Sequence, residues 1–147
     1  MSAFNMLVVL GSTASGKTKL AVELARMLNG EVISADSRQV YRGLDIGSGK
    51  DLDEYQEIKH HLIDIVDPGY EYNIFDFQQD VINTYEKISI KNKLTIMALG
   101  SALYVDSILK GYRLIVVPDN KPLRATLNKI SQEQLNNHLL QLKTNIT

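Results

Sequence analysis

Cysteine is absent from this chain of 147 residues. Its absence excludes disulfide bonds and thiolate chemistry and suits an enzyme of the reducing cytosol. An excess of charge of one sign is also missing, because 16 basic residues are balanced by 17 acidic ones. A nearly neutral chain lacks the positive field of a protein that binds nucleic acid on its own.

Long apolar runs, internal repeats, low-complexity tracts and linkers are missing as well. The apolar stretch near the N-terminus is too short to span a bilayer, and it lacks the basic start and cleavage site of a signal peptide. Hydrophobic residues make up 44% of the chain and charged residues 22%, ordinary values for a globular protein of about one domain. We therefore expect a soluble, cytoplasmic protein without a membrane partner.

A glycine-rich stretch near the N-terminus gives the strongest signal in the sequence. It follows an apolar run at residues 6–10, which predicts a strand buried on both faces. It precedes residues 18–28, which predict a helix ended by Gly30, with an apolar face of Leu20, Ala21, Leu24 and Leu28. The stretch fits the phosphate-loop pattern G-x-x-x-x-G-K-[ST] with Gly11, Ser12, Thr13, Ala14, Ser15, Gly16, Lys17 and Thr18.

Such a loop turns successive backbone N–H groups inward at the positive end of the next helix, where they bind phosphate oxygens. Lys17 would reach the terminal phosphate of pyrophosphate or of a nucleotide such as ATP, and the Thr18 hydroxyl would hold Mg²⁺. The alternative is a glycine turn that contains a lysine by chance. The strand before the loop and the helix after it favour phosphate binding.

Four polar residues of different chemistry follow a second predicted strand at residues 31–35: Asp36, Ser37, Arg38 and Gln39. Ligands of open α/β sheets bind beyond the carboxyl ends of the strands, so this tetrapeptide should face the same crevice as the loop. Asp36 can accept a proton or hold a metal-bound water, Arg38 can clamp a phosphate, and Gln39 can read a base edge. The alternative is a polar turn that caps the next element.

Three motifs in this order resemble those of the tRNA dimethylallyltransferases. They are residues 11–18, residues 34–47, and residues 60–64 with the Asp67-Pro68 pair. These enzymes transfer a dimethylallyl group from its diphosphate to N6 of the adenosine 3′ to the anticodon. Ser12 replaces the family's usual proline. At residues 99–104, Leu99 and Ala102 replace two glycines of the family pattern G-G-T-G-L-Y, while Ser101 keeps a hydroxyl.

The resemblance implies a role for each part of the site. The loop amides, Lys17 and Mg²⁺ on Thr18 would neutralise the departing pyrophosphate, and Asp36 would take the proton of the adenine amine. The accepting adenosine of the tRNA anticodon stem-loop would be held by Ser37, Arg38, Gln39 and Ser101, with Asp36.

Other elements follow from periodicity and turn residues. We expect a buried strand at residues 62–66, a central strand at 94–99, and an amphipathic helix at 74–90. The apolar stripe of this helix, including its aromatic residues, should face the core: Ile74, Phe77, Val81, Tyr85 and Ile88. The adjacent His60 and His61 would point to opposite faces of a strand, which disfavours a shared metal ion. Residues 47–50 fail as a second phosphate loop, since Leu44 and Asp51 break the pattern.

The tail changes character after residue 118. Pro122 starts one predicted helix, and residues 131–134 form a capping-box pattern that starts another. By resemblance, residues 119–147 begin the helical insertion that grips the anticodon stem. About half of a usual family member, with further diphosphate-binding arginines, lies outside the sequence, so a separately encoded C-terminal half is a possible partner.

The sequence thus predicts a three-layer α/β domain of the P-loop NTPase type, with a mainly parallel sheet at residues 1–118 and a helical extension. The leading function is tRNA dimethylallyl transfer from dimethylallyl diphosphate. Two alternatives stay open. One is a small P-loop nucleotide kinase, which needs lid arginines where the tail offers Arg113 and Arg124. The other is a phosphate-binding remnant or fragment without catalysis.

Overall fold

The computed structural model describes residues 5–114, 118 and 120–142. Their contacts divide the chain into two units, Met1–Leu114 and Ile115–Thr147. The first unit contains the sheet and the candidate site, and the second contains two helices.

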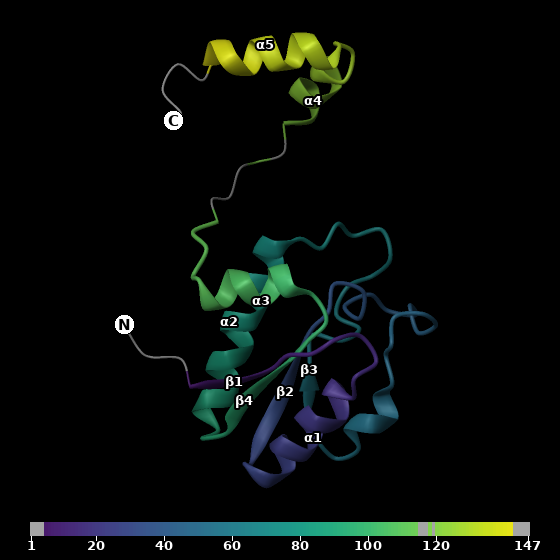
Figure 1. Cartoon of the computed structure of the whole chain (residues 1–147), viewed down its shortest axis with the longest axis vertical. Helices are drawn as coiled ribbons and strands as arrows, with labels where there is room; N and C mark the ends of the chain where they lie inside the picture. Colours follow the sequence, from purple (N-terminus) through teal and green to yellow (C-terminus); the bar gives the residue numbers. More distant parts are fainter. Residues whose placement is uncertain (1–4, 115–117, 119, 143–147) are drawn as a thin grey trace. The chain divides into compact units, whose positions relative to one another are not determined.

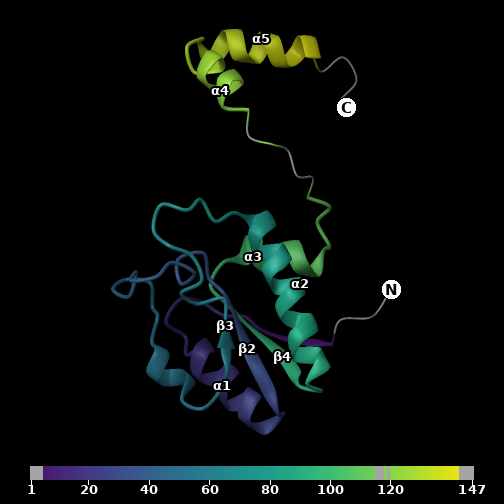
Figure 2. The same cartoon turned by 180° about the vertical axis from the view of Figure 1, so that it is seen from behind.

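The first unit is built on a parallel four-stranded sheet (Figures 1 and 2). The strands lie in the order β1-β4-β2-β3, so β4 and β2 are central. They pair in register from Gly30 opposite Leu94 to Ala35 opposite Leu99. The strand bounds are β1 Met6–Val9, β2 Gly30–Ala35, β3 His60–His61 and β4 Leu94–Leu99.

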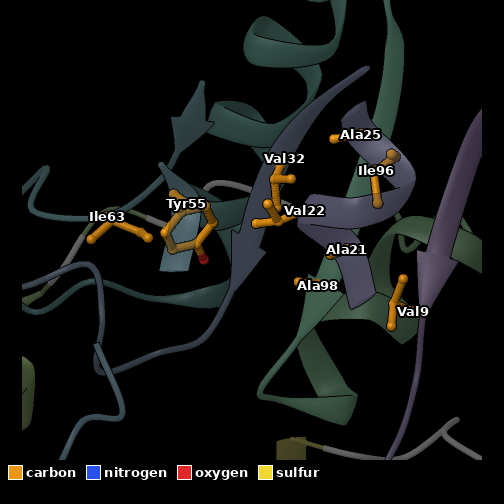
Figure 3. Packing of buried hydrophobic residues seen from close by; sticks show 9 residues of the cluster. All are labelled: Val9, Ala21, Val22, Ala25, Val32, Tyr55, Ile63, Ile96 and Ala98. Atoms are coloured by element: carbon orange, nitrogen blue, oxygen red, sulfur yellow. The ribbon is translucent and has the colours of Figure 1, made fainter. Parts of the chain in front are cut away.

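Helices cover both faces of this sheet. On one face, α1 (Lys17–Met27) packs with the short 3₁₀ helix η1 (Leu52–Tyr55) against a cluster that includes Val32 and Ile96 (Figure 3). On the other face, α2 (Ile74–Ile90) and α3 (Ala102–Leu109) pack on a cluster that includes Ile33 and Met97. Neighbouring residues of a strand face opposite sides, so the two clusters define three layers. The predicted α/β class is confirmed.

Strand β1 is confirmed in position, but its predicted burial on both faces is wrong. Among the residues that the structure describes, β1 pairs only with β4, which places it at an edge of the sheet. Met6, Leu7 and Val8 are half-buried, and only Val9 is buried. An apolar run predicts which residues can be buried, but it does not predict which strand lies at the edge of the sheet.

Helix α1 is also confirmed, with a different buried face. Ala21, Val22 and Ala25 are buried, whereas Leu20 and Leu28 of the predicted stripe are about half exposed. Small side chains let the helix lie close to the sheet. Gly30 does not end the helix as predicted. Asn29 takes the left-handed conformation after the last turn, and Gly30 opens β2 as a buried residue.

The predicted strand at residues 62–66 is wrong. The strand β3 is limited to His60–His61, and Leu62 and Asp64 adopt positive φ angles of 62° and 55°, which interrupt an extended chain. The segment instead pairs with residues 39–42 through irregular backbone bonds, among them Asp64 N–H to the Gln39 carbonyl at 3.0 Å. The predicted opposite orientation of the histidines is confirmed, since His61 meets Glu31 and the His60 ring lies 4.5 Å from that of Tyr55.

The helix at residues 74–90 and the strand at residues 94–99 are confirmed as α2 and β4. Asn73 and Asp76 form a capping box at the start of α2, and Phe77, Val81 and Ile88 of the predicted stripe are buried. Phe77 stacks on Tyr104 of α3 at 4.3 Å, so the helix aromatic belongs to the core, as predicted.

The second unit contains α4 (Lys121–Leu127) and α5 (Gln132–Leu142). The predicted capping box is confirmed, because Gln134 N–H donates to Ser131 Oγ and Ser131 N–H donates to Gln134 Oε1. The predicted start at Asp119 and the end of the tail lie outside the described residues. Neither helix has a buried residue. None of the helices that the structure describes is long and apolar enough to cross a membrane.

A buried ion cluster anchors the amino end of β2, remote from the strands' carboxyl ends. The Glu31 carboxylate is almost fully buried and contacts Lys91, Lys93 and His61 at 3.0, 3.2 and 2.7 Å. Burial raises the pKa of Glu31, but the hydrogen bonds from His61, Lys91 and Lys93 outweigh it and lower the pKa to about 2. Because an ionised carboxylate only accepts, His61 Nε2 carries the shared proton.

We expect Glu31→Gln to destabilise the fold at neutral pH. A pKa lowered from 4.5 to about 2 corresponds to at most about 3 kcal/mol of unfolding free energy. This contribution is complete above the unfolded pKa and disappears as the pH falls from about 5 to about 2. Denaturant unfolding at pH 7 and pH 2 should show a large gap between wild type and variant only at pH 7. Glu57→Gln, which removes an exposed ion pair, is the control. An equal gap at both pH values would contradict this assignment.

Candidate functional site

A cavity of about 440 Å³ lies at the carboxyl ends of the strands. Two segments far apart in the sequence line it together, the glycine loop (residues 11–18) and a loop that contributes Ser48, Gly49 and Asp51. All residues of the predicted phosphate loop except Ser12 line it, together with Asp36 and Gln39. The structure thus brings the first two predicted motifs together in one cavity.

The glycine loop connects β1 to α1 and leads into the helix through Gly16. Gly16 has a φ angle of 77°, which residues with a side chain rarely adopt, and it forms the N-cap of α1. Among the described residues, no side chain caps this end, and the first turn contains no acidic residue. The first N–H groups of α1 therefore remain available to an anion.

Two side chains of the loop are predicted to contact phosphate and metal. Lys17 is half-buried, and its Nζ donates to the Ser12 carbonyl at 2.5 Å. Ser12 therefore contacts Lys17 through its backbone and not through its hydroxyl. Thr18 lies in the first turn of α1 and lines the cavity with Lys17. Oxygen donors of the kind that Mg²⁺ binds, Thr18, Asp36, Asp51 and Glu54, share this lining.

Asp36 follows β2 directly and is held in place from two sides. Its Oδ1 accepts from the Arg38 backbone N–H at 2.8 Å. On the other side it lies against Gly100, where a Cβ atom would come within 2.1 Å of Oδ2. A side chain at position 100 would therefore clash with Asp36, and glycine allows the chain after β4 to lie against this predicted base.

Ser37 and Ser101 join the turn after β2 to the turn after β4. The Ser101 Oγ lies 3.4 Å from the Ser37 backbone N–H, which donates to it, and 3.3 Å from the Ser37 Oγ. The Ser101 N–H donates to the Ala35 carbonyl at 2.8 Å. These serines lie beside Asp36 without lining the cavity, and the Arg38 side chain is exposed outside the lining.

Gln39 lines the cavity, but its amide is engaged within the protein. Its Nε2 group donates to the carbonyls of Ser48 and Gly49 at 3.4 and 3.1 Å, and its Oε1 accepts from the Ser34 hydroxyl at 2.7 Å. Both donors of the amide are thus used. Of the groups that were predicted to read a base edge, only one lone pair on the Gln39 Oε1 is not engaged by these bonds.

Sequence reasoning missed several residues of the lining, above all Tyr55 of η1. Burial, with smaller effects of the Glu54 and Asp36 charges, raises the pKa of Tyr55 to about 12, so its phenol stays protonated. No spacing rule points to residue 55, because it reaches the cavity through tertiary packing. Residues 51–54 gave no motif either.

A neighbouring cavity of about 490 Å³ contains Arg42 and Lys50 but also four aspartates: Asp45, Asp51, Asp53 and Asp64. Carboxylates repel phosphate, and the basic groups are already paired with Asp67, Asp45 and Asp64. The cavity beside the glycine loop is therefore the candidate site.

A parallel α/β sheet with a glycine loop between its first strand and first helix defines the P-loop NTPase-like class of folds. The sequence also matches the IPP transferase family over residues 39–146. This chain belongs to that family.

Curated relatives support the assignment along nearly the whole chain. It is 60% identical over 132 residues to tRNA dimethylallyltransferase 1 of Geotalea daltonii, covering 90% of this chain and 43% of the relative. It is 56% identical over 142 residues to tRNA dimethylallyltransferase 2 of Shewanella sediminis, covering 97% and 47%. The chain therefore spans less than half the length of these relatives.

Solved structures agree with the fold. The full-length tRNA isopentenylpyrophosphate transferase of Bacillus halodurans superposes with a TM-score of 0.75 at 36% identity, over 96% of this chain and 48% of that one. The tRNA delta(2)-isopentenylpyrophosphate transferase of Staphylococcus epidermidis gives a TM-score of 0.69 at 34% identity, over 92% and 46%.

Proposed function

We propose that this chain forms the diphosphate-binding and proton-accepting part of a tRNA dimethylallyltransferase. The observation that carries the proposal is the position of Asp36 in the same cavity as the glycine loop. A leaving diphosphate and an accepting amine must meet within one site, and here a phosphate cradle and a carboxylate share one. The proposed acceptor is N6 of the adenosine 3′ to the anticodon, and the proposed donor is dimethylallyl diphosphate.

In this reaction the C1–O bond of the donor breaks, and a bond forms between C1 and N6. The electrons of the broken bond leave with pyrophosphate, which the loop amides and Lys17 neutralise. Asp36 takes the proton lost by N6, held for this task by the Arg38 N–H and by Gly100. Mg²⁺, when bound at Thr18, would add positive charge beside the departing oxygens.

Lys17→Ala tests the diphosphate half of the proposal. Loss of one charge-assisted contact should weaken pyrophosphate binding by about 1.5–3 kcal/mol, roughly ten- to a hundredfold in Kd. Titration calorimetry on the chain measures this effect. Lys19→Ala, which removes an exposed lysine of the same helix, should leave Kd unchanged. Equal affinity in Lys17→Ala and wild type, or no binding by wild type, contradicts phosphate binding at this loop.

A transfer assay tests the whole proposal. Residues 1–147 are fused to the C-terminal portion of the Geotalea daltonii relative that this chain does not span, and the fusion is called the completed enzyme. Labelled dimethylallyl diphosphate and unmodified tRNA are the substrates. We expect transfer by the completed enzyme and much weaker transfer by the chain alone. If the intact relative is active while the completed enzyme only binds pyrophosphate, the chain is a binding remnant. Phosphoryl transfer from ATP to a nucleotide would instead identify a kinase.

A further inference from the structure

Lys50 is a buried lysine that the proposed reaction does not use. Its side chain is 1% exposed, and its ammonium donates to the Tyr41 carbonyl, Asp45 Oδ1 and Asp64 Oδ1 at 2.9, 3.1 and 2.6 Å. An ammonium has three N–H donors, so all of them are satisfied. Burial disfavours its charge, but the hydrogen bonds and charges of Asp64 and Asp45 outweigh burial and raise the pKa of Lys50. The ammonium is a fixed, charged centre.

These contacts close the loop of residues 41–50 onto its own beginning. Tyr41 and Asp45 lie in the first half of the loop, and Lys50 lies at its end. Asp64 belongs to the irregular segment that bonds residues 39–42 through the backbone, including Ile65 N–H to the Val40 carbonyl at 2.8 Å. One ammonium thus joins three stretches of chain that have no strand or helix of their own.

The closed loop presents two carbonyls to Gln39. Ser48 and Gly49, directly before Lys50, accept both N–H groups of the Gln39 amide. Because both acceptors are carbonyls and the partner of Oε1 is the Ser34 hydroxyl, only one orientation of the amide satisfies the bonds. Gln39 is 9% exposed and stands in the turn that begins with Asp36.

We propose that Lys50 is a positioning residue, which closes the loop of residues 41–50 so that its carbonyls hold Gln39 and thereby the turn that carries Asp36. The Ser48–Gly49 wall of the cavity depends on the same closure. The glycine loop does not, because no hydrogen bond between the described residues joins it to residues 41–50. The link to catalysis rests on the proposed function, whereas the positioning itself can be measured without turnover.

Hydrogen–deuterium exchange on the chain tests the positioning. Lys50→Met removes the donors and keeps a similar side-chain length. Exchange should become about tenfold faster or more in peptides covering residues 36–51 and 60–66, while residues 94–99 of β4 stay at the wild-type rate. Lys110→Met is the matched control, since Lys110 forms an ion pair of 2.6 Å on the exposed surface. Unchanged exchange, or equal acceleration in β4, overturns the proposal.

Two further variants separate positioning from general stability. Asp64→Asn keeps an oxygen acceptor for Lys50 but loses the charge that offsets its burial, so its exchange should lie between wild type and Asp64→Leu, which should resemble Lys50→Met. Gln39→Glu removes the donors to Ser48 and Gly49, so it should accelerate the same peptides with Lys50 intact. If Lys50→Met does not fold, Gln39→Glu serves as the test variant. A wild-type exchange rate of residues 36–51 and 60–66 in Gln39→Glu overturns the proposal.

Pyrophosphate binding keeps this proposal distinct from the proposed function. Lys50→Met should bind pyrophosphate within about twofold of wild type, because no hydrogen bond between the described residues joins the glycine loop to residues 41–50. In the completed enzyme, the same variant should lower kcat for transfer about tenfold or more through displacement of Asp36. Failure of the wild-type chain to bind pyrophosphate would contradict the proposed function alone, and the exchange result would still decide the role of Lys50.

Discussion

Asp36→Asn should lower the rate of dimethylallyl transfer by the completed enzyme by roughly 10²–10⁴-fold, the usual contribution of a general base. An asparagine oxygen can still accept from the Arg38 N–H, so the turn after β2 keeps its bond. The amide cannot take the proton of N6. Single-turnover transfer measures the loss, and the melting temperature should change little.

Asp53→Asn is the matched control, because Asp53 lies on η1 and lines only the neighbouring cavity. It should keep nearly full activity. Pyrophosphate binding should persist in Asp36→Asn, since the base does not take part in the cradle. Near wild-type transfer by Asp36→Asn would show that another group accepts the proton.

Gly100→Ala should be nearly as damaging, although it adds a single methyl group. The new Cβ would lie 2.1 Å from Asp36 Oδ2 and 2.6 Å from its Cγ, far inside contact distance, so the carboxyl group must move. A displacement of about 1 Å can cost about 10²-fold in rate. We expect a loss of that order in the transfer assay, with about 1–3 kcal/mol of destabilisation from overpacking.

The double variant Gly100→Ala/Asp36→Asn shows whether the methyl group acts through Asp36. If it does, the double variant should lose no more activity than Asp36→Asn alone, because the two changes damage one function. Multiplicative losses would mean that Gly100 serves the site in another way. A fully active Gly100→Ala would indicate that the carboxyl position is not critical.

The glycine loop and Asp36 could be located from the sequence because each depends on local chemistry. The loop needs a glycine where φ is positive and a lysine directly after it, and these residues stand at a fixed spacing in the sequence. Asp36 directly follows a strand, and parallel strands end at one edge of the sheet. The helix at residues 74–90 was equally accessible, since its periodicity extends over several turns.

The remaining parts of the site depend on contacts between distant segments. Gln39 looked free to read a base, but Ser48 and Gly49 engage its amide. Residues 47–50 failed as a second phosphate loop and so gave no role to Lys50, yet two aspartates and a carbonyl accept its hydrogen bonds. The false strand at residues 62–66 has the same origin, because Leu62 and Ile63 are buried in an irregular segment that bonds a turn.

The edge position of β1 affects how the isolated chain can be handled. In the part of the chain that the structure describes, one side of this strand has no paired neighbour, and its residues are Met, Leu and Val without a charge. An uncharged, unpaired edge is a template for strand addition between molecules, and such edges promote aggregation. Purified samples should therefore self-associate as concentration rises. Leu10→Lys would place a charge at an exposed position directly after this strand and should improve solubility.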